Sequence, residues 1–294
     1  MFHSPSAPRD RPALLWQALL FFLLLLPAVV RAHPLVLDQD DGSFALVPHV
    51  EVLEDPGGKL DLAAVRQAAA AGRFAPAHAL GELNFGYSSS AFWLRIPLES
   101  RLQRSSPWLL EIAFPSLDRV ELFLPRADGR VDYQLTGDRL PFAERPYPNR
   151  NLVLPLELGP GESLALYLRV ESEGSLTLPL TLWTPDAFRL HNQDAYAGFS
   201  LYYGMLLALG LYNLLLFFAL RERIYLVYVA FAVSMAVGQL SLNGLGNEYI
   251  WPAFPAWGNV ALPSGFAATG FFGAIFTRLF LNTRHSNPRA DKLI

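Results

Sequence analysis

The chain has 294 residues, of which 52% are hydrophobic and only 17% are charged, whereas ordinary soluble domains have about 25% charged residues. This composition indicates a protein that resides partly in a membrane. The formal net charge of -3 comes without runs of lysine or arginine, which excludes a nucleic-acid surface. The absence of cysteine excludes disulfides, thiolate metal sites and a cysteine nucleophile.

The first residues have the pattern of an export signal. Arg9 and Arg11 precede an apolar run at 13–30, and residues of small or medium size follow up to Ala32. This pattern predicts a signal peptide over residues 1–32 that is cleaved after Ala32, and an uncleaved membrane anchor is the alternative. In both cases the next segment is exported, because positive residues stay on the cytoplasmic side.

Residues 33–194 are predicted to form one exported domain that is mostly β. Short apolar or alternating runs are separated by turn dipeptides such as Asp128-Gly129, a pattern typical of an antiparallel sandwich or barrel. One helix is expected at 62–71, capped by Asp61 and ended by Gly72. The runs expected to be strands are 44–53, 91–98, 108–114, 119–124, 131–135, 151–158, 164–170 and 176–183.

This domain carries no recognisable catalytic or metal-binding pattern. His33, His49 and His78 lack metal-ligand spacing, and no nucleophile elbow or glycine-rich phosphate loop occurs. The acidic stretch 38–42 is rich in oxygen ligands but lacks the alternation and distal glutamate of an EF-hand, so we interpret it as solvated. The sequence therefore predicts a chain that is not an enzyme and uses no cofactor or metal.

The segment 84–95 is the first of two regions that suit ligand binding. Its aromatic side chains precede Arg95, and such a set can stack on and hydrogen-bond to a sugar or another small polar ligand. Strand alternation predicts Trp93 and Arg95 on one face of the sheet and Phe92 on the other, with Leu94 and Ile96. A core position for Trp93 is the more ordinary interpretation.

The proline-rich loop 137–150 is the second region. A loop of this length in a compact domain is often functional, and clustered arginines bind carboxylate, sulfate or phosphate groups. The alternative is an exposed loop that is held against its own sheet. The candidate ligand-binding residues of the two regions are Trp93, Arg95, Arg139, Glu144, Arg145 and Arg150.

Three apolar stretches follow, each long enough to span a bilayer as a helix: 197–220, 224–242 and 260–281. The turn after the first stretch carries arginines and the loop after the second carries none, so the positive-inside rule places the β domain and that loop outside. We expect a multi-pass protein of the bacterial inner membrane with a periplasmic N-terminal domain. The connector 184–196 is predicted to be semi-rigid, because it is short and not rich in glycine or serine.

Several motifs, in this order, resemble the bacterial seven-transmembrane receptors with diverse intracellular signalling modules. They are GYSSSAFWLRIPL, EIAFPSLDRVELFL, GDRLPFAERPYPNRNLVLPLEL, YLRVESEGSLTLPLTLWTPDAF and LYYGMLLALGLYNLLLFFALRERIYLVYVAF, and the likeness covers residues 45–282. The resemblance implies a periplasmic jelly-roll sensor domain, similar to carbohydrate-binding modules, on a membrane domain at 195–294. It also implies relay to a cytoplasmic histidine kinase or diguanylate cyclase.

The sequence thus predicts a β sandwich of jelly-roll type followed by transmembrane helices, acting as a signalling receptor. Its predicted partners are a small molecule or ion in the periplasm, membrane lipid, a sister copy in a homodimer and a cytoplasmic kinase or cyclase module. The alternative is a non-catalytic interaction module that docks a partner protein or sister subunit. Because the family has seven helices and this sequence has three, we expect a fragment, a truncated product or a member without its own output.

Overall fold

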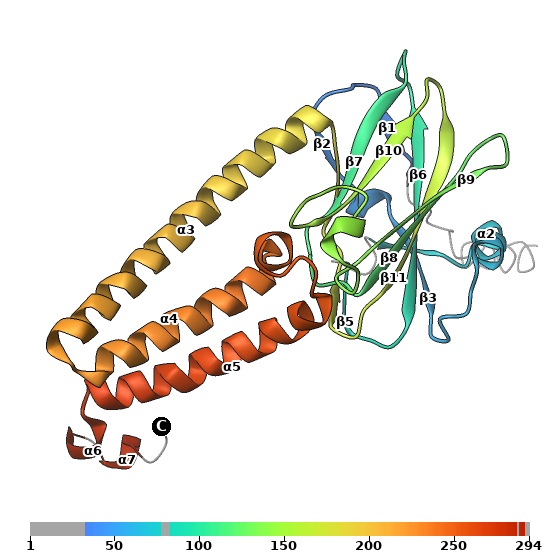
Figure 1. Cartoon of the computed structure of the whole chain (residues 1–294). Coiled ribbons are helices and arrows are strands. Elements are labelled where there is room, and N and C mark those ends of the chain that lie inside the picture. The colour runs from blue at the N-terminus through green and yellow to red at the C-terminus, as the bar shows by residue number, and fades with distance from the viewer. Residues whose placement is uncertain (1–32, 78–82, 287, 292–294) are drawn as a thin grey trace, which may run out of the picture. The chain divides into compact units, whose positions relative to one another are not determined.

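The computed structural model of the chain describes residues 33–77, 83–286 and 288–291 (Figure 1). The predicted signal peptide with its cleavage site, and His78, lie outside these residues. Within them, a region of antiparallel β-sheets is followed by three long apolar helices.

Two sheets make up most of the β region. The larger, seven-stranded sheet has the order β4-β3-β6-β11-β8-β9, with β1 paired in parallel to β6, and the smaller has the order β10-β7-β13-β2. Figure 1 shows β6, β8 and β11 side by side, as their pairing requires. The strands are β1 Leu35–Leu37, β2 Ser43–Ala45, β3 Glu51–Asp55, β4 Ala75–Pro76, β5 Asn84–Tyr87, β6 Ala91–Ser100, β7 Ser106–Ile112, β8 Arg119–Pro125, β9 Val131–Thr136, β10 Leu152–Leu158, β11 Ser163–Glu171, β12 Ser175–Thr177 and β13 Leu180–Trp183.

The two sheets share one apolar core. Phe92 and Leu94 of β6 lie in it, together with Trp108 of β7 and Leu154 of β10. Trp93 points away from this core, as a strand period of two requires, and belongs to a second cluster. The alternation predicted for this strand is therefore confirmed, and the fold is sandwich-like.

Helix α2 (Leu62–Ala70) covers part of the outer face of the larger sheet. The Asp61 side chain caps it by accepting a hydrogen bond from the backbone N–H of Ala64 at 2.8 Å, as predicted. Val65 and Ala68 on its inner face pack with Trp93. The burial of this stripe is what holds the helix against the sheet.

Two runs that were expected to be continuous strands are broken. The run 44–53 contains β2, a short 3-10 helix η1 (Val47–His49) and β3, while the run 176–183 contains β12 and β13. A proline lies in each break, Pro48 in the first and Pro179 in the second. Proline has no N–H to give to a strand ladder, which explains the interruptions.

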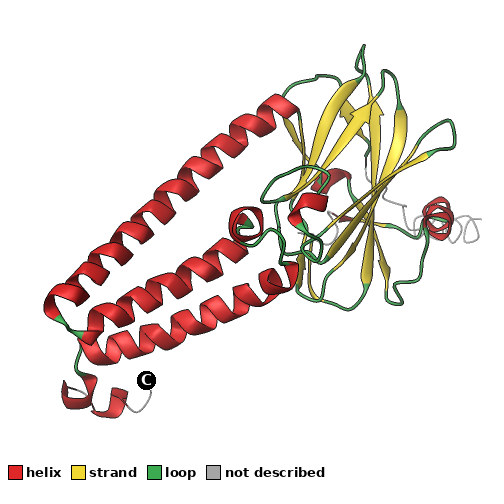
Figure 2. Ribbon diagram, viewed as in Figure 1, coloured by secondary structure: helices red, strands yellow, loops and turns green. Residues whose placement is uncertain are grey.

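Helices α3 (Pro185–Leu220), α4 (Arg223–Leu242) and α5 (Pro255–Phe280) are, among the described residues, those long and apolar enough to cross a membrane (Figure 2). A π-helical turn, η4 (Gly246–Ile250), lies between α4 and α5, and short helices α6 (Thr283–Ser286) and α7 (Pro288–Asp291) follow. Helix α3 begins well before the expected span at 197–220. The reason is that Pro185 suits a first helical turn and Phe188 is buried against the sandwich.

Candidate functional site

A cavity of about 430 Å³ lies at one end of the larger sheet. The segment before β6 contributes three consecutive serines, Ser88 to Ser90, and the start of β8 contributes Arg119. The loop after β9 contributes Arg139, and the end of β11 contributes Glu171. Because β6, β11, β8 and β9 are neighbours in the sheet, four segments that are distant in sequence meet at this end of the strands.

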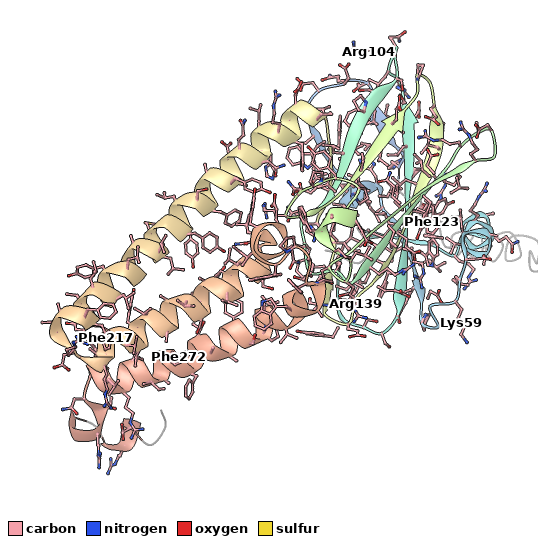
Figure 3. All side chains as sticks on the ribbon, in the orientation of Figure 1. Lys59, Arg104, Phe123, Arg139, Phe217 and Phe272 are labelled. Atoms are coloured by element: carbon pink, nitrogen blue, oxygen red, sulfur yellow. The ribbon has the colours of Figure 1, made fainter. Side chains whose placement is uncertain are left out.

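Arg139 ties together three of the loops around this cavity. Its Nη2 lies 2.8 Å from Asp118 Oδ2 and 2.6 Å from Glu173 Oε2. The backbone N–H of Glu173 also donates to Asp118 Oδ2 at 3.0 Å. The hydrogen bond to Glu173 and the nearby carboxylates raise the pKa of Arg139 above its ordinary value. Figure 3 shows Arg139 at the end of the sandwich opposite to Arg104.

Tyr87 precedes the cavity residue Ser88 in the sequence and is 84% exposed. It ends strand β5, directly before Ser88, and pairs across the strands with Ser175, close to Glu173 in sequence. Of the other three aromatic residues of the first candidate region, Phe92 and Trp93 are buried, and Phe85 is partly buried and stacks on Phe92 with 4.1 Å between ring centroids. Tyr87 is thus the most exposed aromatic side chain of that region.

The structure places Trp93 and Arg95 away from this cavity. Trp93 is only 1% exposed, lies beneath α2 and stacks on Phe123 with 5.5 Å between ring centroids. Arg95 forms an ion pair with Glu51 on the neighbouring strand β3. Neither residue belongs to the lining of this cavity.

Within the 137–150 loop, Arg145 is buried and contacts other residues of the loop itself. It is 8% exposed, its Nη1 donates to the carbonyl oxygens of Asn149 at 2.7 Å and Arg150 at 3.2 Å, and its guanidinium lies over the ring of Phe142. Burial lowers the pKa of Arg145 to about 10. Glu144 ends the short helix η3 (Phe142–Glu144) and is exposed.

The far end of the same loop contacts the helical segment. The guanidinium of Arg150 lies 4.9 Å from the ring centroid of Phe199 on α3, and its Nη1 lies 3.5 Å from the carbonyl oxygen of Asn243, just after α4. Nearer the start of the loop, the backbone N–H of Phe142 donates to the carbonyl oxygen of Pro252 at 3.0 Å. The loop is therefore not held by its own sheet alone, because it also bridges to the helices.

Tyr196 joins the pieces of this contact. Its hydroxyl accepts from the backbone N–H of Arg150 at 3.4 Å and donates to Glu248 Oε2 at 2.6 Å. Asn243 donates from Nδ2 to the hydroxyl of Tyr203 at 2.9 Å. Helix α3, the turn η4 and the 137–150 loop are consequently linked through hydrogen bonds of the Tyr196 hydroxyl.

Glu111 was not among the residues proposed from the sequence. It is 2% exposed on β7 and accepts hydrogen bonds from Asn151 Nδ2 at 2.7 Å and Trp183 Nε1 at 2.9 Å. Glu111 thereby connects Asn151, which follows the 137–150 loop, to Trp183, the last residue of β13. A single glutamate within the otherwise apolar run 108–114 was the sequence signal for it.

The described residues contain no group of three or more histidine, aspartate or glutamate side chains that could hold a metal ion. The acidic stretch 38–42 is largely exposed, and its Asp40 pairs with Arg104 at 2.6 Å. The lining of the cavity beside Arg139 combines arginines, carboxylates and serine hydroxyls, which offer both hydrogen-bond donors and acceptors.

Comparison with protein families finds two matches. Residues 47–184 match the family described as 7TMR-DISM extracellular 2, and residues 195–294 match the family described as 7TM diverse intracellular signalling. Both families are sensory or signalling families. No curated protein matches the chain.

Solved structures give weak likenesses. An alpha-xylosidase from Xanthomonas citri is 12% identical with a TM-score of 0.22, and the match covers 46% of this chain and 15% of that one. An isomalto-dextranase from Arthrobacter globiformis complexed with panose is 12% identical with a TM-score of 0.19, and the match covers 34% of this chain and 17% of that one. This chain therefore spans a small part of both proteins, and neither likeness informs its fold or function.

Proposed function

Because the chain belongs to the 7TMR-DISM membrane signalling receptors, with a periplasmic domain followed by an inner-membrane segment, we propose that the cavity beside Arg139 binds a small ligand and that the 137–150 loop passes the bound state to the helices. The family matches support the order of an extracellular domain followed by a membrane domain. The ligand, the loop's role and the cytoplasmic output are our proposal.

The observation that carries this proposal is that the 137–150 loop contacts both the cavity and the helical segment. Near its start, Arg139 and Leu140 line the cavity. At its end, Arg150 contacts Phe199 and Asn243 in the helical segment. A ligand that displaces Arg139 therefore moves a segment whose other end is bonded to α3 and to the turn after α4.

The cavity chemistry favours a neutral ligand with several hydroxyl groups, such as a carbohydrate. Each charged residue that lines the cavity already has a partner of opposite charge, so a bare ion would have to compete with these pairs. The pairs are Arg139 with Asp118 and Glu173, Arg119 with Glu121, and Glu171 with Arg169. The serines 88–90 add hydroxyl groups that donate and accept. The exposed ring of Tyr87, which precedes these serines in the chain, offers an apolar face for stacking on a sugar ring.

We further propose that the signal ends in a cytoplasmic histidine kinase or diguanylate cyclase module. The chain would then act without chemistry of its own, by biasing the arrangement of its helices. A ligand shifts such an equilibrium only by its difference in affinity for the two arrangements. The bonds of Arg139 supply that difference here, because ligand binding competes with Asp118 and Glu173 for its guanidinium.

Calorimetric titration of the full chain in lipid nanodiscs, against neutral oligosaccharides, small carboxylates and calcium, tests the proposal. We expect saturable binding of a neutral sugar that weakens at least about ten-fold, or about 1.4 kcal/mol, in the variant Arg139→Ala. The matched control is Arg130→Ala, which removes an exposed arginine that pairs with Asp128 on the β8–β9 hairpin. Binding of no sugar, or equal affinity in Arg139→Ala and Arg130→Ala, would contradict the proposal.

A further inference from the structure

Asp138, next to the cavity residue Arg139, is buried with an unsatisfied oxygen. Its side chain is 7% exposed, and its Oδ1 has no hydrogen-bond partner within the part of the chain that the structure describes. Its backbone N–H donates to the carbonyl oxygen of Leu117 at 2.8 Å, which fixes the residue inside the fold. A buried polar atom without a partner is uncommon in native proteins and needs an explanation.

The charged groups that face Asp138 do not neutralise it. Asp118 is a second carboxylate before β8, and Arg139 is bonded to Asp118 and Glu173. Arg145, the other nearby cation, donates to backbone carbonyl oxygens. Among the ion pairs of the described residues, none includes Asp138. Burial, together with the charge of Asp118, raises the pKa of Asp138 to about 7.

We propose that Asp138 takes up a proton from the periplasm and that its protonation decides how firmly the 137–150 loop is held. When the carboxyl is neutral, its burial beside Asp118 is tolerated. When it is ionised, a buried charge that forms no ion pair favours opening of the loop, which hydrates the carboxylate. The consequence for signalling rests on the proposed function, whereas the switch itself does not.

The direction of the pH effect follows from proton linkage. In the closed loop Asp138 holds its proton up to about pH 7, whereas in an opened loop it behaves like an ordinary carboxyl with a pKa of 3.8. Between these two pKa values the closed form binds more protons than the open form. The stability of the closed loop relative to the open loop is therefore highest below the lower pKa and falls as the pH rises between the two values. Opening becomes about ten-fold more frequent per pH unit in that window and levels off above about pH 7.

Hydrogen–deuterium exchange of the full chain in nanodiscs, without any ligand, tests the switch between pH 5 and pH 9. After correction for intrinsic exchange rates, protection of the 137–150 amides in the wild type should fall about ten-fold from pH 5.5 to 6.5 and stay level above about pH 7.5. In Asp138→Asn, which keeps the shape and cannot ionise, protection should be independent of pH and remain high at pH 8.

The matched control is Asp128→Asn, the same substitution at an exposed carboxylate of the β8–β9 hairpin. In this variant, protection of the 137–150 amides should keep its wild-type pH dependence. Wild-type protection that does not change with pH, or an unchanged pH dependence in Asp138→Asn, would overturn the proposal. If Asp138→Asn does not fold, the wild-type profile and the infrared band of a protonated carboxyl decide, and absence of that band at pH 6 overturns it. Since no ligand is present, these outcomes are separate from failure of the sugar-binding proposal.

Discussion

The carbonyl oxygen of Arg150 lies so close to Gly244 that a Cβ atom added at this glycine would clash with it. Gly244 follows α4 and has a φ of +78°, in the left-handed region that favours glycine. The same Cβ would also lie 2.9 Å from Pro115 Cβ. The loop from the sandwich and the turn after α4 therefore approach each other at the level of the backbone, where no side chain can rearrange to make room.

Substitution Gly244→Ala should separate these two segments. The added methyl group meets backbone and proline atoms, so the loop or the turn has to shift. We expect amide protection of residues 142–150 in the full chain to fall at least about five-fold, which corresponds to about 1 kcal/mol. Hydrogen–deuterium exchange in nanodiscs measures it.

Gly129→Ala is the control for this substitution. Gly129 has a φ of +88°, similar to that of Gly244, but an added Cβ meets nothing within 4 Å. The control therefore carries the backbone strain alone, and protection of the 137–150 loop should stay at the wild-type level. Equal effects of both substitutions would mean that the close approach to Arg150 is unimportant.

Arg150→Lys should weaken the contact with α3 while keeping the charge. The planar guanidinium lies over the ring of Phe199 and also reaches the carbonyl oxygen of Asn243, and an ammonium group cannot do both. The expected loss is about 0.5–1 kcal/mol, seen as faster exchange of the amides at 243–250. Arg101→Lys, at an exposed arginine paired with Glu99, is the control and should leave these amides unchanged.

Trp93→Ala should act on stability. Trp93 is 1% exposed beneath α2, so its removal leaves a large cavity against Phe123 and should cost about 3–5 kcal/mol in urea unfolding followed by circular dichroism. Tyr87→Ala, at the exposed ring of the same region, should change stability by less than about 0.5 kcal/mol. A small effect of Trp93→Ala would show that its burial contributes little.

The sequence allowed the local features to be predicted, because they depend on neighbouring residues. Alternation along 92–96 separated Phe92 and Leu94 from Trp93, and Asp61 before an alanine-rich stretch predicted the capped helix. The apolar stretches predicted the three long helices, although not that α3 begins at Pro185.

The contacts of the 137–150 loop were not predictable, because they join residues far apart in sequence. Nothing local to Phe142 indicates its bond to Pro252, and nothing near Arg150 indicates Phe199 or Asn243. The arginines looked alike in sequence, yet Arg145 is buried on backbone carbonyls and Arg139 lines a cavity. Which role each arginine takes depends on strand order, which no single motif encodes.

The orientation of the helices can be tested with reporter fusions. A reporter that is active only in the periplasm should be active when fused within 247–255, in the segment around η4, and inactive when fused after Arg223 at the start of α4. The arginines of the turn 221–223 and the lack of Lys or Arg in 243–259 are the physical reason. An active fusion after Arg223 would contradict this orientation.

The last prediction concerns which of two routes carries a bound state into the membrane. Helix α3 is itself one route, because Phe188 in its first turn is buried against the sandwich and the helix continues to Leu220. The second route is the 137–150 loop, through Arg150 and Tyr196. A flexible Gly/Ser insertion after Asn192 falls between Phe188 and Tyr196, so it interrupts only the first route.

Since the chain has no cysteine, a single cysteine placed by Glu222→Cys between α3 and α4 can carry a fluorescent probe that reports ligand binding. We expect the insertion to leave ligand affinity unchanged and to lower the probe's response, because a flexible segment cannot transmit displacement as a continuous helix does. An alanine-rich insertion of about seven residues, roughly two helical turns, is the control and should preserve the response. Combining the Gly/Ser insertion with Arg150→Ala should abolish it. A full response with the Gly/Ser insertion alone would show that α3 is not needed as a rigid connection and that the loop is the sufficient route.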